Sequence, residues 1–178
     1  MLQEQEYDKH CRLIRDLSVL LSENSIRMLL LKGVACSLNY PNPSHRSVGD
    51  IDIYCFEQGV KANRVFESKG IAVAEHLGHH SRLVIDGVSI ENHHLLMDED
   101  NYRSNRGFES EIQNLLSSDI EEAEIGGGKV LVPGPTLMAL HLLRHSSEDF
   151  ASNTTNLRQM LDYALLVNRR SADIDWNR

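Results

Sequence analysis

Several features are scarce or absent in this sequence of 178 residues, and each absence narrows the class of protein. No apolar run approaches the roughly 18 residues that a membrane-spanning helix needs, so we expect no membrane partner. The segment 1–10 is polar and charged, which is unlike a secretory signal. The three cysteines, Cys11, Cys36 and Cys55, are odd in number and widely spaced. They favour reduced core residues of a cytoplasmic protein over a disulfide framework.

Positive charge is also scarce. Eighteen Lys and Arg residues against 26 Asp and Glu residues give a formal net charge of −8. A protein that coats nucleic acid needs a basic footprint, so nucleic acid is disfavoured as a partner. A small nucleotide is not excluded, because metal ions and one or two local cations can neutralise its phosphates. The 41% hydrophobic and 25% charged content is that of a soluble globular protein.

The hydrophobic pattern predicts an amphipathic helix over 4–23, followed by mixed strands and helices. Strands are predicted over 26–31, 48–56, 71–75, 81–85 and 88–97, with helices over 34–40 and 58–69 and a loop with a helix over 100–117. Asp86-Gly87 is typical of a tight hairpin turn, and Gly126-Gly127-Gly128 of a second turn. Two helices are then predicted over 136–150 and 153–167, with Thr136 and Asn153 near cap positions.

This order indicates an α+β (mixed α/β) fold, a small mixed sheet flanked by helices, with a C-terminal helical lobe. Pro133-Gly134-Pro135 is the clearest boundary in the chain. We therefore expect a core over 1–132 and the helical lobe over 133–178. The sequence shows no internal repeat and no low-complexity segment.

Two carboxylates, Asp50 and Asp52, stand one residue apart in the predicted strand 48–56. Alternation sends Ile51 and Ile53 to the core face and both aspartates to the other face. Like charges so placed repel each other unless a cation lies between them, and magnesium prefers carboxylate and phosphate oxygens. Removing both charges should then leave the fold intact or slightly more stable. The alternative interpretation is an exposed strand edge that carries two charges for solubility.

Neighbouring residues favour the metal interpretation. Lys32-Gly33 ends a strand and precedes a helix, a geometry that presents backbone N–H groups to an anion. Arg46 could clamp a triphosphate or pair with the aspartates, and Gly49 would allow a phosphate to approach closely. By themselves, however, a lysine and a glycine at a strand end are more often surface residues.

A third carboxylate follows the Asp86-Gly87 turn. Alternation in the strand 88–97 places Glu91 and His93 on one face, opposite Ile90. If this strand lies beside the Asp50–Asp52 strand, Glu91 becomes the third oxygen ligand that two-metal phosphoryl transfer requires.

These motifs, Leu-Lys-Gly, Arg46-x-x-Gly49-Asp50-Ile51-Asp52-Ile53 and Ile90-Glu91-Asn92-His93, resemble an uncharacterised bacterial nucleotidyltransferase family of the DNA polymerase beta-like superfamily. Leu140-His141-x-x-x-His145 and Leu157-Arg158-x-x-x-x-Asp162 resemble it too, so the similarity covers most of the chain in order. The resemblance implies that a nucleoside monophosphate passes from a nucleoside triphosphate to a hydroxyl group, with magnesium or manganese as cofactor. The acceptor is a small molecule, a sugar, a peptide or a protein.

On that resemblance Asp50, Asp52 and Glu91 bind metal and carry catalysis, while the phosphates are bound by Lys32, Gly33, Arg46 and Gly49. Two departures from the wider superfamily matter. Lys32-Gly33 replaces the usual Gly-Ser, so the phosphate-binding hydroxyl is missing or comes from another group such as Ser37. The third acid is Glu91, one methylene longer than the commoner aspartate.

The sequence contains nine histidines, which suggests a second hypothesis, a zinc site. His141 and His145 share a helix face and could bind zinc, but the glutamate of a zinc protease motif is missing. Packing is the commoner role of such a pair; with His93 they are candidates to line the cleft. Two alternatives to the nucleotidyltransferase therefore stay open, a non-catalytic nucleotide-binding or interaction module that keeps the fold, and a zinc hydrolase.

Overall fold

A computed structural model of the protein describes residues 2–77, 80–97, 105–153 and 156–177. The strands are β1 (Leu29–Leu30), β2 (Ile51–Tyr54), β3 (Val73–Leu77), β4 (His80–Ile85), β5 (Val88–His93), β6 (Ile120–Ile125) and β7 (Gly128–Pro133). The helices are α1 (Leu2–Glu23), α2 (Val34–Ser37), α3 (Gly59–Ser68), α4 (Asn105–Leu115), α5 (Pro135–Ala151) and α6 (Leu157–Arg170), with short 3-10 turns at Pro43–His45, Phe56–Gln58 and Ser171–Asp173.

The strands form one seven-stranded sheet in the order β3-β4-β5-β2-β1-β7-β6. The pairs β2–β5 and β1–β7 are parallel, and the other pairs are antiparallel. This mixed sheet with flanking helices confirms the predicted fold class. Among the described residues, none of the helices combines the length and the apolar character needed to cross a bilayer.

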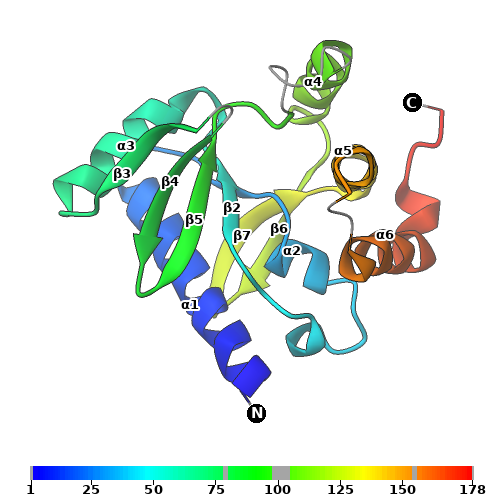
Figure 1. Ribbon diagram of the computed structural model, residues 1–178, viewed down its shortest axis with the longest axis horizontal. Helices are drawn as coiled ribbons and strands as arrows, with labels where there is room; N and C mark the ends of the chain where they lie inside the picture. The colour runs from blue at the N-terminus through cyan, green and yellow to red at the C-terminus, as the bar shows by residue number, and fades with distance from the viewer. Residues whose placement is uncertain (1, 78–79, 98–104, 154–155, 178) are drawn as a thin grey trace.

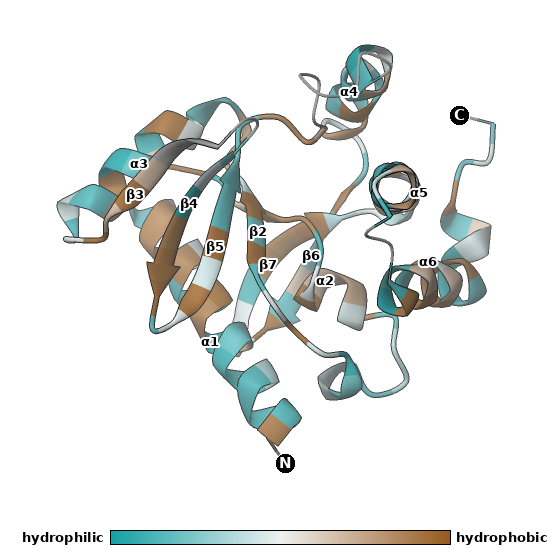
Figure 2. Ribbon diagram, viewed as in Figure 1, coloured by the Kyte–Doolittle hydropathy of each residue, from teal (hydrophilic) through white to brown (hydrophobic). Residues whose placement is uncertain are grey.

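Alternation along the strands divides the core between the two faces of the sheet. Ile51 and Ile53 pack with side chains of α1 and α3, such as Leu17 and Phe66. The opposite face packs Leu29, Leu31 and Tyr54 against α4 and the start of α5. Figure 1 shows α1 and α3 on one side of the sheet and α4, α5 and α6 on the other. In Figure 2, β7 is largely brown, whereas the first turns of α1 are largely teal.

Both predicted turns are hairpins. Asp86 and Gly87, with φ of 51° and 77°, connect β4 to β5. Gly126 and Gly127, with φ of 61° and 80°, connect β6 to β7, so that Gly128 already belongs to the second strand. A Cβ atom on Gly126 would lie 2.3 Å from the backbone oxygen of Cys11, so this turn packs directly against α1.

The cap positions of the last two helices differ from the prediction. Asn156, not Asn153, caps α6, and it forms a capping box with Gln159. Thr136 lies inside α5, whose N-cap is Gly134. The Asp119 carboxylate accepts a hydrogen bond from the backbone N–H of Leu137 at 2.6 Å. Asp119, just before β6, therefore supplies the acceptor that this N–H group lacks within the first turn of α5.

Most predicted strands are longer than the observed ones. The segment 26–31 pairs only at Leu29–Leu30, and β2 begins at Ile51 rather than at residue 48. Asp50 is therefore an exposed residue just before the strand, while Asp52 is buried within it. Only Asp52 therefore lies within the strand, whereas strand alternation predicted both aspartates on one strand face. The first residues of the predicted loop, 100–104, lie outside the described residues.

Candidate active site

The parallel pairing of β2 and β5 sets Asp52 directly opposite Glu91. Both side chains point away from the face that Ile51 and Ile90 bury, and His93 follows Glu91 on the same face. The His93 Nε2 atom lies 3.0 Å from Asp52 Oδ1 and 3.8 Å from Glu91 Oε2. One ligand atom from each of the three side chains can be chosen so that all lie within 4.8 Å of one another.

Asp52 is held as a carboxylate by a cation. Its Oδ1 atom lies 3.2 Å from Lys32 Nζ, and its side chain is only 2% exposed. Burial by itself raises the pKa of Asp52, but Lys32 and His93 outweigh burial and leave the pKa well below its usual range. The pKa of Lys32 is raised in turn, because Asp52 and Asp50 outweigh the effect of its own burial.

Glu91 is compensated from the neighbouring strand β4. Arg82 donates to Glu91 Oε1 at 2.6 Å, and His80 Nε2 lies 3.5 Å from the same oxygen. Glu91 raises the pKa of the Arg82 guanidinium further. Each buried carboxylate of the sheet face therefore has one cationic partner, Lys32 or Arg82.

A cavity of about 200 Å³ opens beside Asp52. Its wall combines three basic side chains, Lys32, Arg46 and Arg158, with three acids, Asp50, Asp52 and Asp162. Gly33 and Gly49 also line the cavity. Gly33 has φ of 66°, a left-handed conformation that favours glycine. The Gly49 carbonyl contacts His10 Nε2 at 2.7 Å, which fixes the loop before β2 on helix α1.

A buried ion pair joins this loop to helix α6. Arg46 donates to both carboxylate oxygens of Asp162, at 2.8 and 2.7 Å, and Tyr40 donates to Asp162 Oδ1 at 2.7 Å. Asp162 is thus a buried ion-pair partner of the loop before β2. Arg46 pairs with this acid rather than with Asp50 or Asp52.

Arg158 is the basic side chain that sequence reasoning left without a role. It lies on the exposed first turn of α6 and donates to the backbone oxygen and the hydroxyl of Ser47, at 3.4 and 3.2 Å. Arg46 also donates to the Ser47 oxygen, at 3.1 Å. Two guanidinium groups therefore converge on one carbonyl oxygen, and Asp162 compensates only Arg46. The motif Leu157-Arg158 carried the only sequence signal for this residue.

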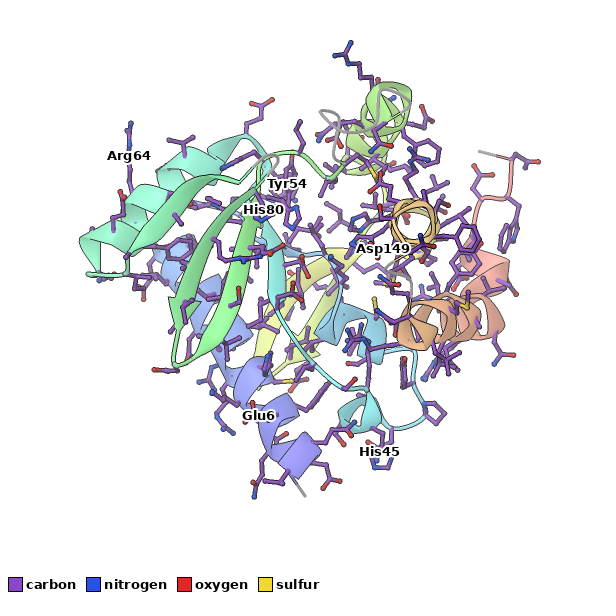
Figure 3. The ribbon with its side chains drawn as sticks, in the orientation of Figure 1. Glu6, His45, Tyr54, Arg64, His80 and Asp149 are labelled. Carbon is purple, nitrogen blue, oxygen red and sulfur yellow. The ribbon has the colours of Figure 1, made fainter. Side chains whose placement is uncertain are left out.

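Helix α5 contributes two of the predicted histidines. His145 lines the cavity, with Nε2 2.9 Å from Lys32 Nζ and Nδ1 3.0 Å from Asp149 Oδ2. His141 is buried, and its ring meets that of His145 edge-on. Burial lowers the pKa of both histidines, and that of His141 falls well below the usual value. Figure 3 shows the labelled side chains of His80 and Asp149 on facing sides of the region between the sheet and α5.

Ser37 is placed away from the cavity. Its hydroxyl is fully buried, donates to the Val34 carbonyl at 2.6 Å and contacts the Tyr7 hydroxyl at 2.8 Å. With both contacts directed into the protein, this hydroxyl does not substitute for the missing serine of the first turn. Sequence spacing could not reveal this, because the Tyr7 contact comes from another helix.

The comparisons with known proteins concern the sequence family and the fold of this chain. A sequence model of the family described as uncharacterised nucleotidyltransferases matches residues 3–178. No functionally curated protein matches the chain significantly in sequence.

Among solved structures, the antibiotic-resistance factor ANT(2'')-Ia is similar with a TM-score of 0.68 and 15% identity, over 94% of this chain and 87% of that one. A second ANT(2'')-Ia structure, in complex with adenylyl-2''-tobramycin, gives a TM-score of 0.66 and 16% identity over 93% and 91%. A Thermotoga maritima protein assigned as a nucleotidyltransferase gives 0.55 and 19% over 86% and 93%. At these identities the similarity concerns the fold.

Proposed function

The chain belongs to a family of uncharacterised nucleotidyltransferases, and from this premise we propose that it transfers a nucleoside monophosphate from a metal-bound nucleoside triphosphate to an acceptor hydroxyl. The observation that carries the proposal is the β2–β5 pairing, which sets Asp52 opposite Glu91. Asp52 also lines a cavity with Lys32 and Arg158. Carboxylates for a metal and cations for phosphates are what phosphoryl transfer requires.

The donor atoms fit a divalent metal. Asp52 and Glu91 present carboxylate oxygens within ligand spacing of one another, and Asp50 offers another carboxylate on the cavity wall. We assign Asp50, Asp52 and Glu91 as the residues that hold magnesium or manganese. Bound there, the metal would neutralise phosphate charge and lower the pKa of the attacking hydroxyl.

The cavity wall supplies the phosphate-binding groups. Lys32, Gly33, Arg46 and Gly49 bind the triphosphate in this proposal, and Arg158 joins them. Arg46 already has a carboxylate partner in Asp162, so it contributes by orienting the loop as well as by charge. Arg158 donates only to Ser47 among the contacts of the described residues, which leaves its remaining N–H groups for an anion.

In the reaction the acceptor hydroxyl attacks the α-phosphorus in line. A P–O bond to the acceptor forms, the bond between the α- and β-phosphates breaks, and pyrophosphate leaves. Glu91, which lies opposite Asp52 on the neighbouring strand, receives the hydroxyl proton. Lys32 and Arg158 hold the departing pyrophosphate by charge.

The acceptor is a hydroxyl-bearing small molecule, sugar, peptide or protein. The ANT(2'')-Ia complex contains adenylyl-2''-tobramycin, a nucleotidylated small molecule, and so offers an analogy for the first of these. The net charge of −8 disfavours nucleic acid. We also propose that residues 1–132 form the catalytic core and that the helical lobe 133–178 closes the cavity, to which it contributes His145 and Arg158.

Calorimetry with each nucleoside triphosphate, with and without magnesium, tests this proposal. We expect metal-dependent binding that weakens at least about tenfold in Asp50→Asn and in Glu91→Gln. Asp8→Asn, which removes an exposed carboxylate from α1, is the matched control and should bind as the unaltered protein does. Equal binding with and without magnesium, unchanged in Asp50→Asn, would sink the metal-site assignment. Metal-dependent binding without pyrophosphate release in any acceptor mixture would favour the non-catalytic module.

A further inference from the structure

The cluster of side chains that could bind a metal ion contains a nitrogen donor as well as oxygen donors. The atoms of Asp52, Glu91 and His93 that could bind an ion all lie within 4.8 Å of one another. All three side chains are buried, with relative exposures of 2%, 8% and 5%. By contrast, Asp50 lies outside this group and is exposed on the cavity wall. The enclosed ligand set found in the described part of the chain is therefore two carboxylates and one imidazole.

A nitrogen ligand changes which ion the site prefers. Mg²⁺ takes oxygen ligands and keeps much of its water, whereas first-row transition ions accept imidazole readily. We propose that His93 Nε2 is a direct metal ligand and that the site therefore binds Mn²⁺ in preference to Mg²⁺. This inference rests on the proposed function, because it concerns the ion that the transfer reaction uses.

The register of β5 explains why His93 faces the ion. In a strand, residues two apart point to the same face, so His93 joins Glu91 above the sheet. The parallel partner β2 has Asp52 opposite Glu91 and Tyr54 opposite His93. His93 Nε2 then lies nearer to Asp52 than to Glu91, at 3.0 and 3.8 Å. An ion between the two carboxylates would be within reach of this nitrogen.

The competing explanation is that His93 serves only as a cationic counterion. The surrounding charges argue against it, because each carboxylate already has a permanent cation. Lys32 pairs with Asp52 at 3.2 Å, and Arg82 pairs with Glu91 at 2.6 Å. The two carboxylates therefore do not require His93 as a counterion, and an imidazole nitrogen is a common ligand of first-row metal ions. Arg82 is half exposed, so it can move aside as an ion enters.

Electron spin echo spectroscopy of bound Mn²⁺ tests the proposal without any substitution. Nitrogen coordinated to Mn²⁺ modulates the echo, and we expect a ¹⁴N modulation that changes to the ¹⁵N pattern when the protein is made with ¹⁵N-histidine. Titration should also show Mn²⁺ binding at least about tenfold tighter than Mg²⁺. A bound Mn²⁺ signal without histidine nitrogen, or equal affinity for the two ions, would overturn the proposal.

Substitution then identifies the histidine. His93→Asn retains a donor oxygen and should abolish the nitrogen modulation and most of the Mn²⁺ preference. His45→Asn, at an exposed position, should retain both. Metal titrations are carried out first without nucleotide. Histidine-bound Mn²⁺ with no triphosphate binding would refute the proposed function alone, and metal-dependent triphosphate binding without histidine coordination would refute this inference alone.

Discussion

Replacing Asp52 by asparagine is expected to destabilise the protein, although the sequence argument predicted that Asp50 and Asp52 repel each other and that removing both charges would leave the fold intact or slightly more stable. Asp52 is 2% exposed and lies 3.2 Å from Lys32 Nζ. Removing one partner of a buried ion pair costs roughly 3–5 kcal/mol, because the other charge is left buried. Lys32 is 21% exposed and also contacts His145, so we expect about 3 kcal/mol, at the low end of that range.

Urea denaturation followed by circular dichroism measures this difference. For a chain of this length, about 3 kcal/mol corresponds to a fall in Tm of roughly 6–12 °C. Asp50→Asn is the matched control, since Asp50 is exposed and its loss should change stability by no more than about 0.5 kcal/mol. Adding Lys32→Met to Asp52→Asn should recover much of the loss, because the uncompensated cation is then gone.

The pH dependence of this difference has a defined sign. The pKa of Asp52 is lowered in the folded protein, so its stabilising contribution is present above the unfolded pKa of about 3.9. The contribution disappears only as the pH falls through the still lower folded pKa. If Asp52→Asn were as stable as the unaltered protein at pH 7, the argument from the Lys32 ion pair would be wrong.

Three further predictions follow from the same structure. Arg158→Gln should weaken triphosphate binding, measured by calorimetry, about tenfold without loss of stability. Arg169→Gln, on the same helix, should leave binding unchanged, and equal effects of the two substitutions would refute the role of Arg158. Burial lowers the pKa of His141, so the unfolded chain binds the extra proton and stability should fall below about pH 6.5, by up to about 1.4 kcal/mol per pH unit. Urea denaturation at pH 7 and 5.5 checks this, and His141→Gln should flatten the decline. Gly126→Ala should cost more than about 2 kcal/mol in the same assay, because the Cβ would lie 2.3 Å from the Cys11 oxygen and φ is 61°; an unchanged midpoint would show that the turn can shift.

Local sequence rules predicted where the strands and turns occur, although not where most strands end, and this has a physical reason. Asp86-Gly87 adopts positive φ at both residues, which few other residue pairs tolerate, so its hairpin was predictable. Glu91 and His93 share a face because side chains alternate in any strand. Neither rule depends on distant parts of the chain.

The contacts that complete the site could not be predicted in the same way. The Arg46–Asp162 ion pair joins residues 116 apart, and no local pattern specifies which acid a buried arginine will find. The parallel pairing of β2 with β5 was only a condition in the sequence argument, because strand order depends on the whole sheet. Asp50 fell outside the strand, since the hydrogen-bonded ladder starts at Ile51, three residues later than the hydrophobic pattern suggests.

The Arg46–Asp162 pair also limits how this protein can be recombined. Both carboxylate oxygens of Asp162 bind Arg46, and Tyr40 donates to the same acid. A chimera that takes α6 from a relative must therefore bring an acid at this position, or a buried guanidinium remains without a partner. Exchange of the last two helices to alter specificity therefore requires either that acid in the incoming helix or exchange of the loop residues 40–46 together with the helices.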